Sequence, residues 1–162
     1  MERSKKVVFI SHCILNQNTV VNPLARAKGA YRDIVQEIMN NGIGIHQLPC
    51  PEYRHLGLNR KPMNKLEYDT VDFRTLCKDI SKDAINMMKE YLENGYEIVG
   101  LIGINNSPTC SIRTTKGILM EELLSLVEKE KIHLNTLDVP TKYFDGKDNK
   151  KFIEDLREFI KN

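Results

Sequence analysis

The stretch VVFISHC, residues 7–13, decides the fold class. Its apolar residues follow one another without polar alternation, so we expect a strand at Val7–Ser11 that is buried on both faces. Strands of this kind are typical of parallel sheets that are covered by helices on both sides. A cysteine, Cys13, comes shortly after the strand.

The chain beyond this stretch alternates helices with strands. Further strands are predicted at Gly44–Leu48, Glu97–Ile104 and Ile132–Leu137. Apolar residues at helical spacing predict helices at Leu24–Asn40, Asp72–Asn94, Lys116–Lys129 and Asn149–Lys161. This order predicts an α/β protein, a sandwich of three layers with a mostly parallel sheet of about four to five strands. No repeat or long linker divides the sequence, so we expect a single domain over residues 1–162.

The composition does not indicate a nucleic-acid or membrane partner. The formal net charge is only +2, and no apolar run is long enough to cross a bilayer. The N-terminal MERSKK leads straight into the first strand without a signal-peptide cleavage site. We therefore expect a cytoplasmic protein, a monomer or a homodimer, whose partner is a small molecule.

Three of the four cysteines follow predicted strands. Cys13, Cys50 and Cys110 each lie at or just beyond the carboxyl end of an apolar run. All carboxyl ends of a parallel sheet lie at one edge, and neighbouring strands are about 4.8 Å apart. We therefore expect these three thiols to lie close together. Cys77 falls near the start of a helix beside apolar residues and is expected in the core.

Two interpretations of the three strand-end cysteines stay open at this point. Each one alone is typical of an inert core thiol, because free cysteine is often fully buried. Together, three thiolates would leave one position of a tetrahedral metal site open, which suits zinc or an iron–sulfur cluster with a catalytic role. The sequence contains no CxxC pair, which argues against zinc-ribbon and thioredoxin-like sites.

Polar residues accompany the cysteines. Glu52 lies two residues after Cys50, so in extended chain both side chains would share a face, and its carboxylate is a candidate general acid or base. Ser107 could donate to a substrate or simply turn the loop before Cys110. Asn105 and Asn106 likewise could bind a substrate or simply turn the loop. His12 should point away from Cys13 if the strand continues, so we do not expect it to be a ligand.

A long stretch between the second strand and the next helix, Tyr53–Thr70, is predicted to be irregular. Irregular stretches of this length within a compact domain are usually functional or mobile, which makes this one a candidate lid or substrate wall. It contains Arg54, His55 and Arg60, and each of these taken alone is typical of a solvated surface charge.

The order of three short motifs resembles the thiouracil desulfurase (TudS-like) family. The motifs are ISHCILN at residues 10–16, CPE at residues 50–52 and SPTC at residues 107–110. The stretch GLNRKP, residues 57–62, is similar to further Gly-Leu and Arg-x-Pro elements of that family. The similarity extends from about residue 5 to residue 130.

This resemblance implies a Rossmann-like domain with a [4Fe-4S] cluster held by only three cysteines, here Cys13, Cys50 and Cys110. The fourth iron would bind the sulfur of a small thiolated substrate, a thiouracil-like base or a related compound, and polarise its C–S bond. Water would supply the replacing oxygen without net redox chemistry. The resemblance makes Glu52 the acid/base, and makes Ser107 a hydrogen-bonding partner of the substrate or of that water.

The chain departs from the family pattern after the first cysteine. NQNTVVNP, residues 16–23, stands where a glycine and an Arg-Tyr-Asp-Gly-like run are usual, and we expect it to line the substrate pocket. The predicted substrate contacts are Asn16, Arg60, Asn105 and Asn106. The divergence puts free thiouracil in doubt as the substrate, and desulfidase chemistry is predicted more firmly than any named substrate.

Two other functions fit parts of the pattern. A cysteine-nucleophile hydrolase on a Rossmann-like frame would need a thiolate activated by a neighbouring base. A non-catalytic sulfide or iron–sulfur carrier or sensor would keep the three cysteines but tolerate loss of Glu52.

Overall fold

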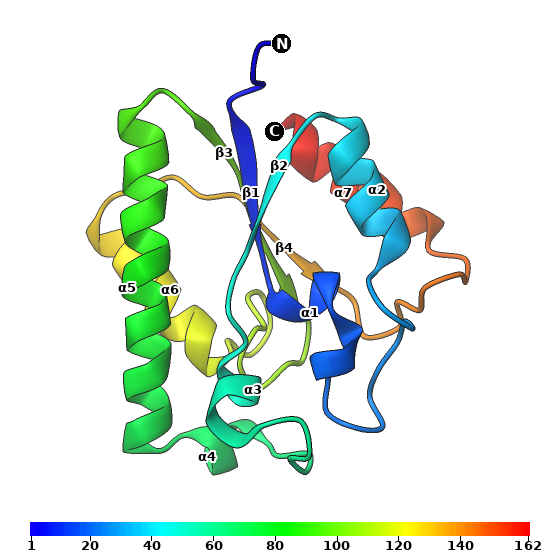
Figure 1. Cartoon of the computed structure of the whole chain (residues 1–162), viewed down its shortest axis with the longest axis vertical. Coiled ribbons are helices and arrows are strands. Elements are labelled where there is room, and N and C mark those ends of the chain that lie inside the picture. Colours follow the sequence, from blue (N-terminus) through cyan, green and yellow to red (C-terminus); the bar gives the residue numbers. More distant parts are fainter.

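Four parallel strands form the centre of the computed structural model, which describes the whole chain, residues 1–162 (Figure 1). The strands are β1 (Lys6–Ile10), β2 (Gly44–Gln47), β3 (Glu97–Ile104) and β4 (Thr136–Val139), in the order β2-β1-β3-β4. Phe9 and Ile10 in β1 are fully buried, as the unbroken apolar run predicts. The predicted α/β class and mostly parallel sheet are confirmed.

Helices cover both faces of the sheet and complete a Rossmann-like sandwich of three layers. The long helices α5 (Val71–Glu93) and α6 (Ile118–Lys129) pack together on one face, and α2 (Arg32–Asn40) and α7 (Lys150–Lys161) pack on the other (Figure 1). The shorter helices are α1 (His12–Leu15), the 3-10 helix η1 (Gln17–Thr19), α3 (Pro51–Leu56) and α4 (Lys65–Tyr68). None of the helices is long and apolar enough to traverse a bilayer.

Local signals explain where the helices begin and end. The Thr70 hydroxyl oxygen accepts a hydrogen bond from the N–H of Phe73 at 3.2 Å and caps α5. At its other end, Gly95 has a φ of 77°, a left-handed conformation that glycine adopts without strain. In α7, Phe152, Leu156 and Phe159 form the predicted buried stripe.

The predicted helix over Leu24–Asn40 is wrong in its first half, because α2 begins only at Arg32. The side chain of Gln17 accepts a hydrogen bond from the N–H of Arg26 at 2.8 Å. The N–H of Gln17 also donates to the carbonyl oxygen of Gly29. These contacts with η1 replace the bonds of a helical turn, so residues 24–31 form an irregular segment.

Other predicted boundaries also shift. The fourth strand lies at Thr136–Val139 instead of Ile132–Leu137, because the N–H of Ile132 instead donates to the carbonyl of Val127 after α6. The helix predicted from Lys116 begins at Ile118, after Gly117, where a Cβ atom would lie 2.2 Å from the carbonyl carbon of Thr109.

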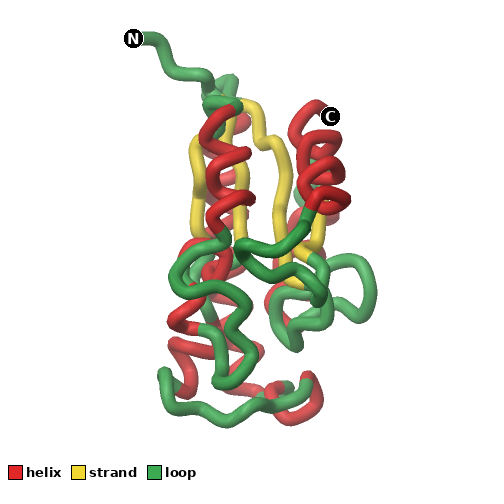
Figure 2. Tube along the Cα trace, turned by 90° about the vertical axis from the view of Figure 1, so that its right-hand side faces the viewer, coloured by secondary structure: helices red, strands yellow, loops and turns green.

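The stretch predicted as irregular, Tyr53–Thr70, in fact contains most of α3 and all of α4. Helix α4 forms because the side chains of Asn64 and Glu67 each accept the backbone N–H of the other, a capping box. The short helices and loops at the carboxyl ends of the strands gather at one end of the molecule (Figure 2). In open parallel sheets this is the end where ligands bind.

Candidate functional site

One cavity of about 460 Å³ lies at the carboxyl ends of the strands. Cys13, Cys50 and Cys110 all line it, and so does Glu52. The three thiols that we expect to lie close together therefore line the same hollow. Cys77, in contrast, is fully buried in the core on α5, as expected.

Each of the three thiols comes from the end of a different strand. Cys13 lies in α1 directly after β1, so the assumption that the strand continues past His12 is wrong. Cys50 is the N-cap of α3, where its Sγ accepts a hydrogen bond from the N–H of Tyr53 at 3.4 Å. Cys110 lies in the loop that follows β3. The sheet order places β1 between β2 and β3, which brings the three cysteines to one edge.

The loop that carries Cys110 is tightly held. The carbonyl oxygen of Cys110 accepts the N–H of Ile104 at 3.0 Å, and a Cβ atom on Gly103 would lie 2.3 Å from that oxygen. The carboxylate of Asp138, in β4, accepts the N–H of Ile112 at 3.1 Å and that of Arg113 at 2.9 Å. The position of this cysteine is therefore fixed by the neighbouring strand as well as by its own.

Burial acts strongly on the three thiols. It raises the pKa of Cys13 well above its usual range, and the negative charges of Cys110 and Cys50 raise it further. Burial likewise raises the pKa of Cys110 to about 12 and raises the pKa of Cys50. An activated nucleophile needs the opposite shift. Thiols in this state become thiolates when a cationic centre replaces their protons.

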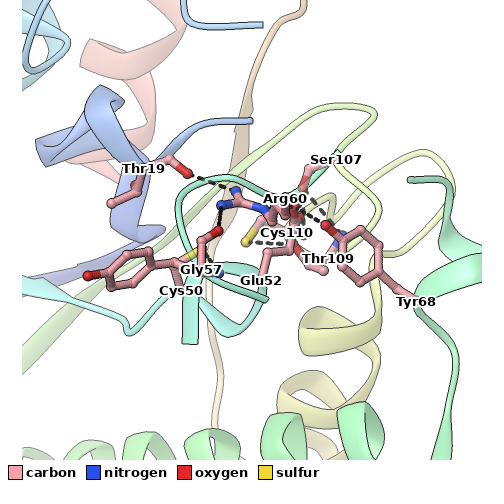
Figure 3. A network of polar contacts seen from close by, with 10 residues as sticks. Thr19, Cys50, Glu52, Gly57, Arg60, Tyr68, Ser107, Thr109 and Cys110 are labelled. Atoms are coloured by element: carbon pink, nitrogen blue, oxygen red, sulfur yellow. Dashed lines mark hydrogen bonds and ion pairs between the residues drawn. The ribbon is translucent and has the colours of Figure 1, made fainter. Parts of the chain in front are cut away.

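Glu52 is buried at the centre of a hydrogen-bond network (Figure 3). Its Oε1 accepts the hydroxyl of Tyr68 at 2.9 Å, and its Oε2 accepts the hydroxyl of Thr109 at 2.7 Å. Arg60 approaches Oε1 at 3.4 Å. The extended-chain argument that paired Glu52 with Cys50 is wrong, because Glu52 lies in the first turn of α3. The helix nevertheless brings both to the cavity.

Hydroxyl groups connect this carboxylate with the Cys110 loop. The Oγ of Ser107 accepts the N–H of Cys110 at 3.0 Å and that of Thr109 at 3.3 Å, so it turns the loop (Figure 3). It also lies 3.3 Å from the Oγ1 of Thr109. Because the single hydroxyl proton of Thr109 goes to Glu52, the proton between the two hydroxyl groups comes from Ser107. Both of these residues line the cavity.

Arg60 lines the cavity but is fully occupied by the protein (Figure 3). Only 3% of its side chain is exposed. Besides approaching Glu52, its guanidinium donates to the carbonyl oxygens of Gly57 at 3.0 Å and Thr19 at 2.7 Å. It thus ties the stretch between α3 and α4 to η1, on the other side of the cavity.

The other residues named as substrate contacts lie in different places. Asn105 and Asn106 line the cavity, and Asn106 has a φ of 62°, in the left-handed region. Asn16 does not line the cavity, because its side chain caps η1 by accepting the N–H of Asn18 at 3.1 Å. Other residues of the 16–23 stretch do line it, namely Gln17, Thr19, Val20, Val21 and Pro23.

The histidines and Arg54 near the site have separate surroundings. His12 lines the cavity, and its Nε2 is buried without a hydrogen-bond partner. Burial lowers the pKa of His12, which favours the neutral imidazole. His55 instead packs edge-on against Phe73, with ring centroids 5.3 Å apart. Neither His55 nor Arg54 lines the cavity.

Three further residues of the site were not singled out from the sequence. Tyr68 and Thr109 hold Glu52, although they lie 16 and 57 residues from it along the chain. Arg26 lines the cavity from the irregular segment 24–31. Only Thr109 had a sequence signal, its place inside the SPTC motif.

The donors of the site do not converge on one point. No three side chains of the His, Cys, Asp and Glu types lie close enough together to hold a single metal ion. The three thiols line one cavity, but as placed they do not form a site for one ion.

Comparison with known proteins gives two matches. A protein-family model described as "Putative 2-thiouracil desulfurase" matches residues 5–149, a range that includes every residue of the site. An uncharacterized protein of Methanocaldococcus jannaschii is 43% identical over 159 residues, which cover 98% of this chain and 99% of that relative. No solved structure matches the chain.

Proposed function

The chain belongs to the 2-thiouracil desulfurase family, and we propose on that premise that it removes sulfur from a small thiolated substrate at a [4Fe-4S] cluster. The observation that carries this proposal is the meeting of three strand-end thiols with a buried, hydrogen-bonded glutamate in one cavity. Cys13, Cys50 and Cys110 are the proposed cluster ligands.

The donor set fits a cluster better than a single ion. All three candidate ligands are thiols, which iron–sulfur clusters prefer. In a cluster each thiolate binds a different iron, so its ligands do not have to converge on one ion, and these thiols do not. Because burial raises their pKa values, the three thiols would be thiolates only when a cationic centre binds them. When bound, the cluster would supply an iron without a protein ligand, a Lewis acid that polarises the C–S bond of the substrate and accepts its sulfur.

Glu52 is the proposed general acid/base. Replacing C=S by C=O with water is a net hydrolysis, which gives the oxo product and hydrogen sulfide and needs no electron donor. Glu52 would take a proton from the attacking water and return it to the departing sulfide. Its two carboxylate oxygens are fixed by Tyr68 and Thr109, so the position of the base is set before substrate binds.

Ser107 and Thr109 would hold the carboxylate of Glu52 from the side of the Cys110 loop. The donation order from Ser107 to Thr109 to Glu52 forms a short chain of hydroxyl groups that ends on the carboxylate. Both acceptor positions of the Ser107 oxygen are taken by the N–H groups of Thr109 and Cys110, so Ser107 would orient the Thr109 hydroxyl toward Glu52. This role accompanies the role of Ser107 in turning the Cys110 loop.

The geometry weighs against the two alternative functions. A cysteine-nucleophile hydrolase would need a thiol with a lowered pKa, whereas burial raises the pKa of all three. A carrier or sensor of sulfide would need the thiols but no positioned carboxylate. The three hydrogen-bond donors around Glu52 are expected of a catalytic group.

The test is turnover by the anaerobically reconstituted protein. We expect 2-thiouracil or a related thiolated base to be converted to its oxo product with one sulfide released per molecule. Product is measured by chromatography and sulfide by a colorimetric assay. Cys77→Ala is the matched control, because this cysteine lies outside the cavity and should leave turnover unchanged. A protein that holds a full cluster but releases no sulfide from any thiolated base tested would contradict the desulfurase assignment.

A further inference from the structure

Arg26 brings a cation into the cavity without a carboxylate partner. It lies on the segment between η1 and α2 and lines the same cavity as the three cysteines. None of the ion pairs in the structure includes it. Apart from His12, the only other basic residue in the cavity lining is Arg60, which is bound to Glu52 and two carbonyl oxygens.

The position of Arg26 is set before any ligand binds. Its N–H donates to the side chain of Gln17 at 2.8 Å, and its carbonyl accepts the N–H of Asp145 at 2.9 Å. Its Nη1 donates to the carbonyl oxygen of Pro140 at 2.7 Å, and its guanidinium carbon lies 5.9 Å from the centre of the Tyr31 ring. Its charge and a side-chain hydrogen bond also act on the Tyr31 hydroxyl, where they oppose the rise in pKa that burial causes.

The surroundings of Arg26 suit a part of the ligand other than its sulfur. Val20, Val21, Pro23, Leu24 and Phe144 form an apolar lining around it. Leu24 and Phe144 are 56% and 46% exposed and Arg26 is partly buried, so water screens its charge in part, and a ligand that covers these residues would strengthen the attraction. An apolar pocket with one placed cation is typical of sites that orient a small anionic ligand.

We propose that Arg26 is a specificity-determining residue that binds a carboxylate of the substrate. The inference rests on the proposed function, and it narrows the substrate class to thiolated compounds that carry a carboxylate. A guanidinium with free N–H groups pairs with one carboxylate in a fork geometry. The single positive charge of Arg26 would balance only one of the two negative charges of a phosphate dianion.

The competing role for Arg26 is charge balance. Its charge lowers the pKa of Cys13 and so partly offsets the effect of burial on that thiol. If this were its purpose, replacing Arg26 would weaken cluster binding and would not change the preference among ligands. The Arg26→Ala variant would therefore lose its preference for a carboxylate ligand in the first role and its iron in the second.

Binding of sulfur-free ligands to the reconstituted protein separates these roles. Isothermal titration compares uracil with orotate, which is uracil with a carboxylate on the ring. We expect the wild-type protein to bind orotate about tenfold more tightly than uracil or better. Arg26→Ala should remove this difference and keep its iron, and Arg26→Lys should restore it in part, because lysine keeps the charge but not the fork. Lys28→Ala is the control, since Lys28 does not line this cavity.

Three results would overturn the inference. Equal affinity of the wild-type protein for uracil and orotate is the first. The second is an Arg26→Ala variant that loses iron but keeps its preference for orotate, because this indicates charge balance. The third is a larger loss of affinity on Arg26→Ala for uridine 5′-monophosphate than for orotate, because this assigns the residue to phosphate binding.

Turnover of the corresponding thio compounds distinguishes failure of this inference from failure of the proposed function. If Arg26-dependent orotate binding is found but neither 2-thiouracil nor 2-thioorotate is desulfurated, the substrate site stands and the desulfurase assignment fails. If both are desulfurated with the same kcat/KM in wild type and Arg26→Ala, the desulfurase assignment stands and the role of Arg26 fails.

Discussion

Two sides of one cavity differ in how their polar groups are satisfied. The paired side is formed by Glu52, Arg60, Ser107 and Thr109, together with Tyr68, which binds Glu52 from outside the lining. Each of these side chains has a hydrogen-bond partner within the protein. On the apolar side, formed by Val20, Val21, Pro23, Leu24, Arg26 and Phe144, the one charged group has no ion-pair partner.

This contrast indicates a division of work. Reacting groups need fixed positions, and hydrogen bonds from several elements provide them at Glu52. A binding surface instead keeps a charge and hydrogen-bond donors free for its ligand, as the guanidinium of Arg26 does. The three cysteines line the same cavity as both sides, so a substrate held at Arg26 could present its sulfur to them. The predictions below test this division, from the largest expected effect to the smallest.

The largest effect should come from the cysteines. Cys13→Ala, Cys50→Ala and Cys110→Ala should each lose the cluster and all turnover, because two thiolates do not hold it firmly. Iron content after anaerobic reconstitution measures this loss. Cys77→Ala should keep its full iron content, since its thiol lies in the core. Full iron in any of the three cavity variants would remove that cysteine from the ligand set.

Glu52→Gln should separate chemistry from cluster binding. The amide keeps the shape of the carboxylate but cannot accept a proton, so kcat should fall by about 10²- to 10⁴-fold while iron content stays near that of wild type. Steady-state kinetics on the best thiolated substrate, with iron analysis of the same sample, provide the measurement. Turnover within about threefold of wild type would show that Glu52 is not the acid/base.

Arg60→Ala should affect stability more than any exposed arginine. Its removal takes away the only cation beside the buried Glu52 carboxylate and the guanidinium donor of two carbonyl oxygens, which should cost about 3 kcal/mol in the free energy of unfolding. Urea unfolding of the cluster-free protein measures this change. Arg157→Ala is the control, because its pair with Glu37 is exposed and its removal should leave the midpoint unchanged. Similar midpoints for the two variants would contradict the role of the paired side in stability.

Tyr68→Phe should have a smaller effect than loss of Arg60. The change removes one hydrogen bond to Glu52 and keeps the ring packed against Phe73, so we expect a cost of about 1 kcal/mol. Urea unfolding gives this value, and kinetics should show a lower kcat with an unchanged KM. A raised KM with an unchanged kcat would assign Tyr68 to binding instead of to positioning Glu52.

The smallest effect concerns Tyr31 on the apolar side and appears only in alkali. Burial raises the pKa of Tyr31 from 10.0 to about 12, so ionisation favours the unfolded chain. Its contribution to stability is complete below pH 10 and is lost as the pH rises toward 12. Thermal unfolding from pH 8 to 11 should show a steeper decline for wild type than for Tyr31→Phe. Parallel curves would contradict the shift.

The sequence predicts the fold well where its pattern is local. The unbroken apolar runs of β1 and β3 predict buried parallel strands, because no other arrangement hides both faces. Residues 24–31 are predicted wrongly because their conformation depends on Gln17, whose contacts with Arg26 and Gly29 have no local pattern. The fourth strand is predicted too early in the chain. Apolar residues after α6 fit the end of the helix and the start of the next strand equally well, so the sequence does not mark where the strand begins.

The residues of the candidate site also divide into those that the sequence predicts and those that it does not. Cysteines at strand ends and Glu52 beside Cys50 are visible in sequence, because the edge of a parallel sheet brings strand ends together. Tyr68 has no such mark, since it reaches Glu52 only after α3 and α4 have folded. Arg26 is likewise a solvated charge by its sequence alone, and only the folded segment 24–31 places it in the cavity.

The central claim is that three thiols hold a cluster, and its most direct test is elemental analysis of the wild-type protein. The protein is reconstituted without oxygen, and its iron and acid-labile sulfide are counted per chain. We predict about four of each. One zinc per chain without sulfide, or no bound metal under conditions that load other iron–sulfur proteins, would contradict the account.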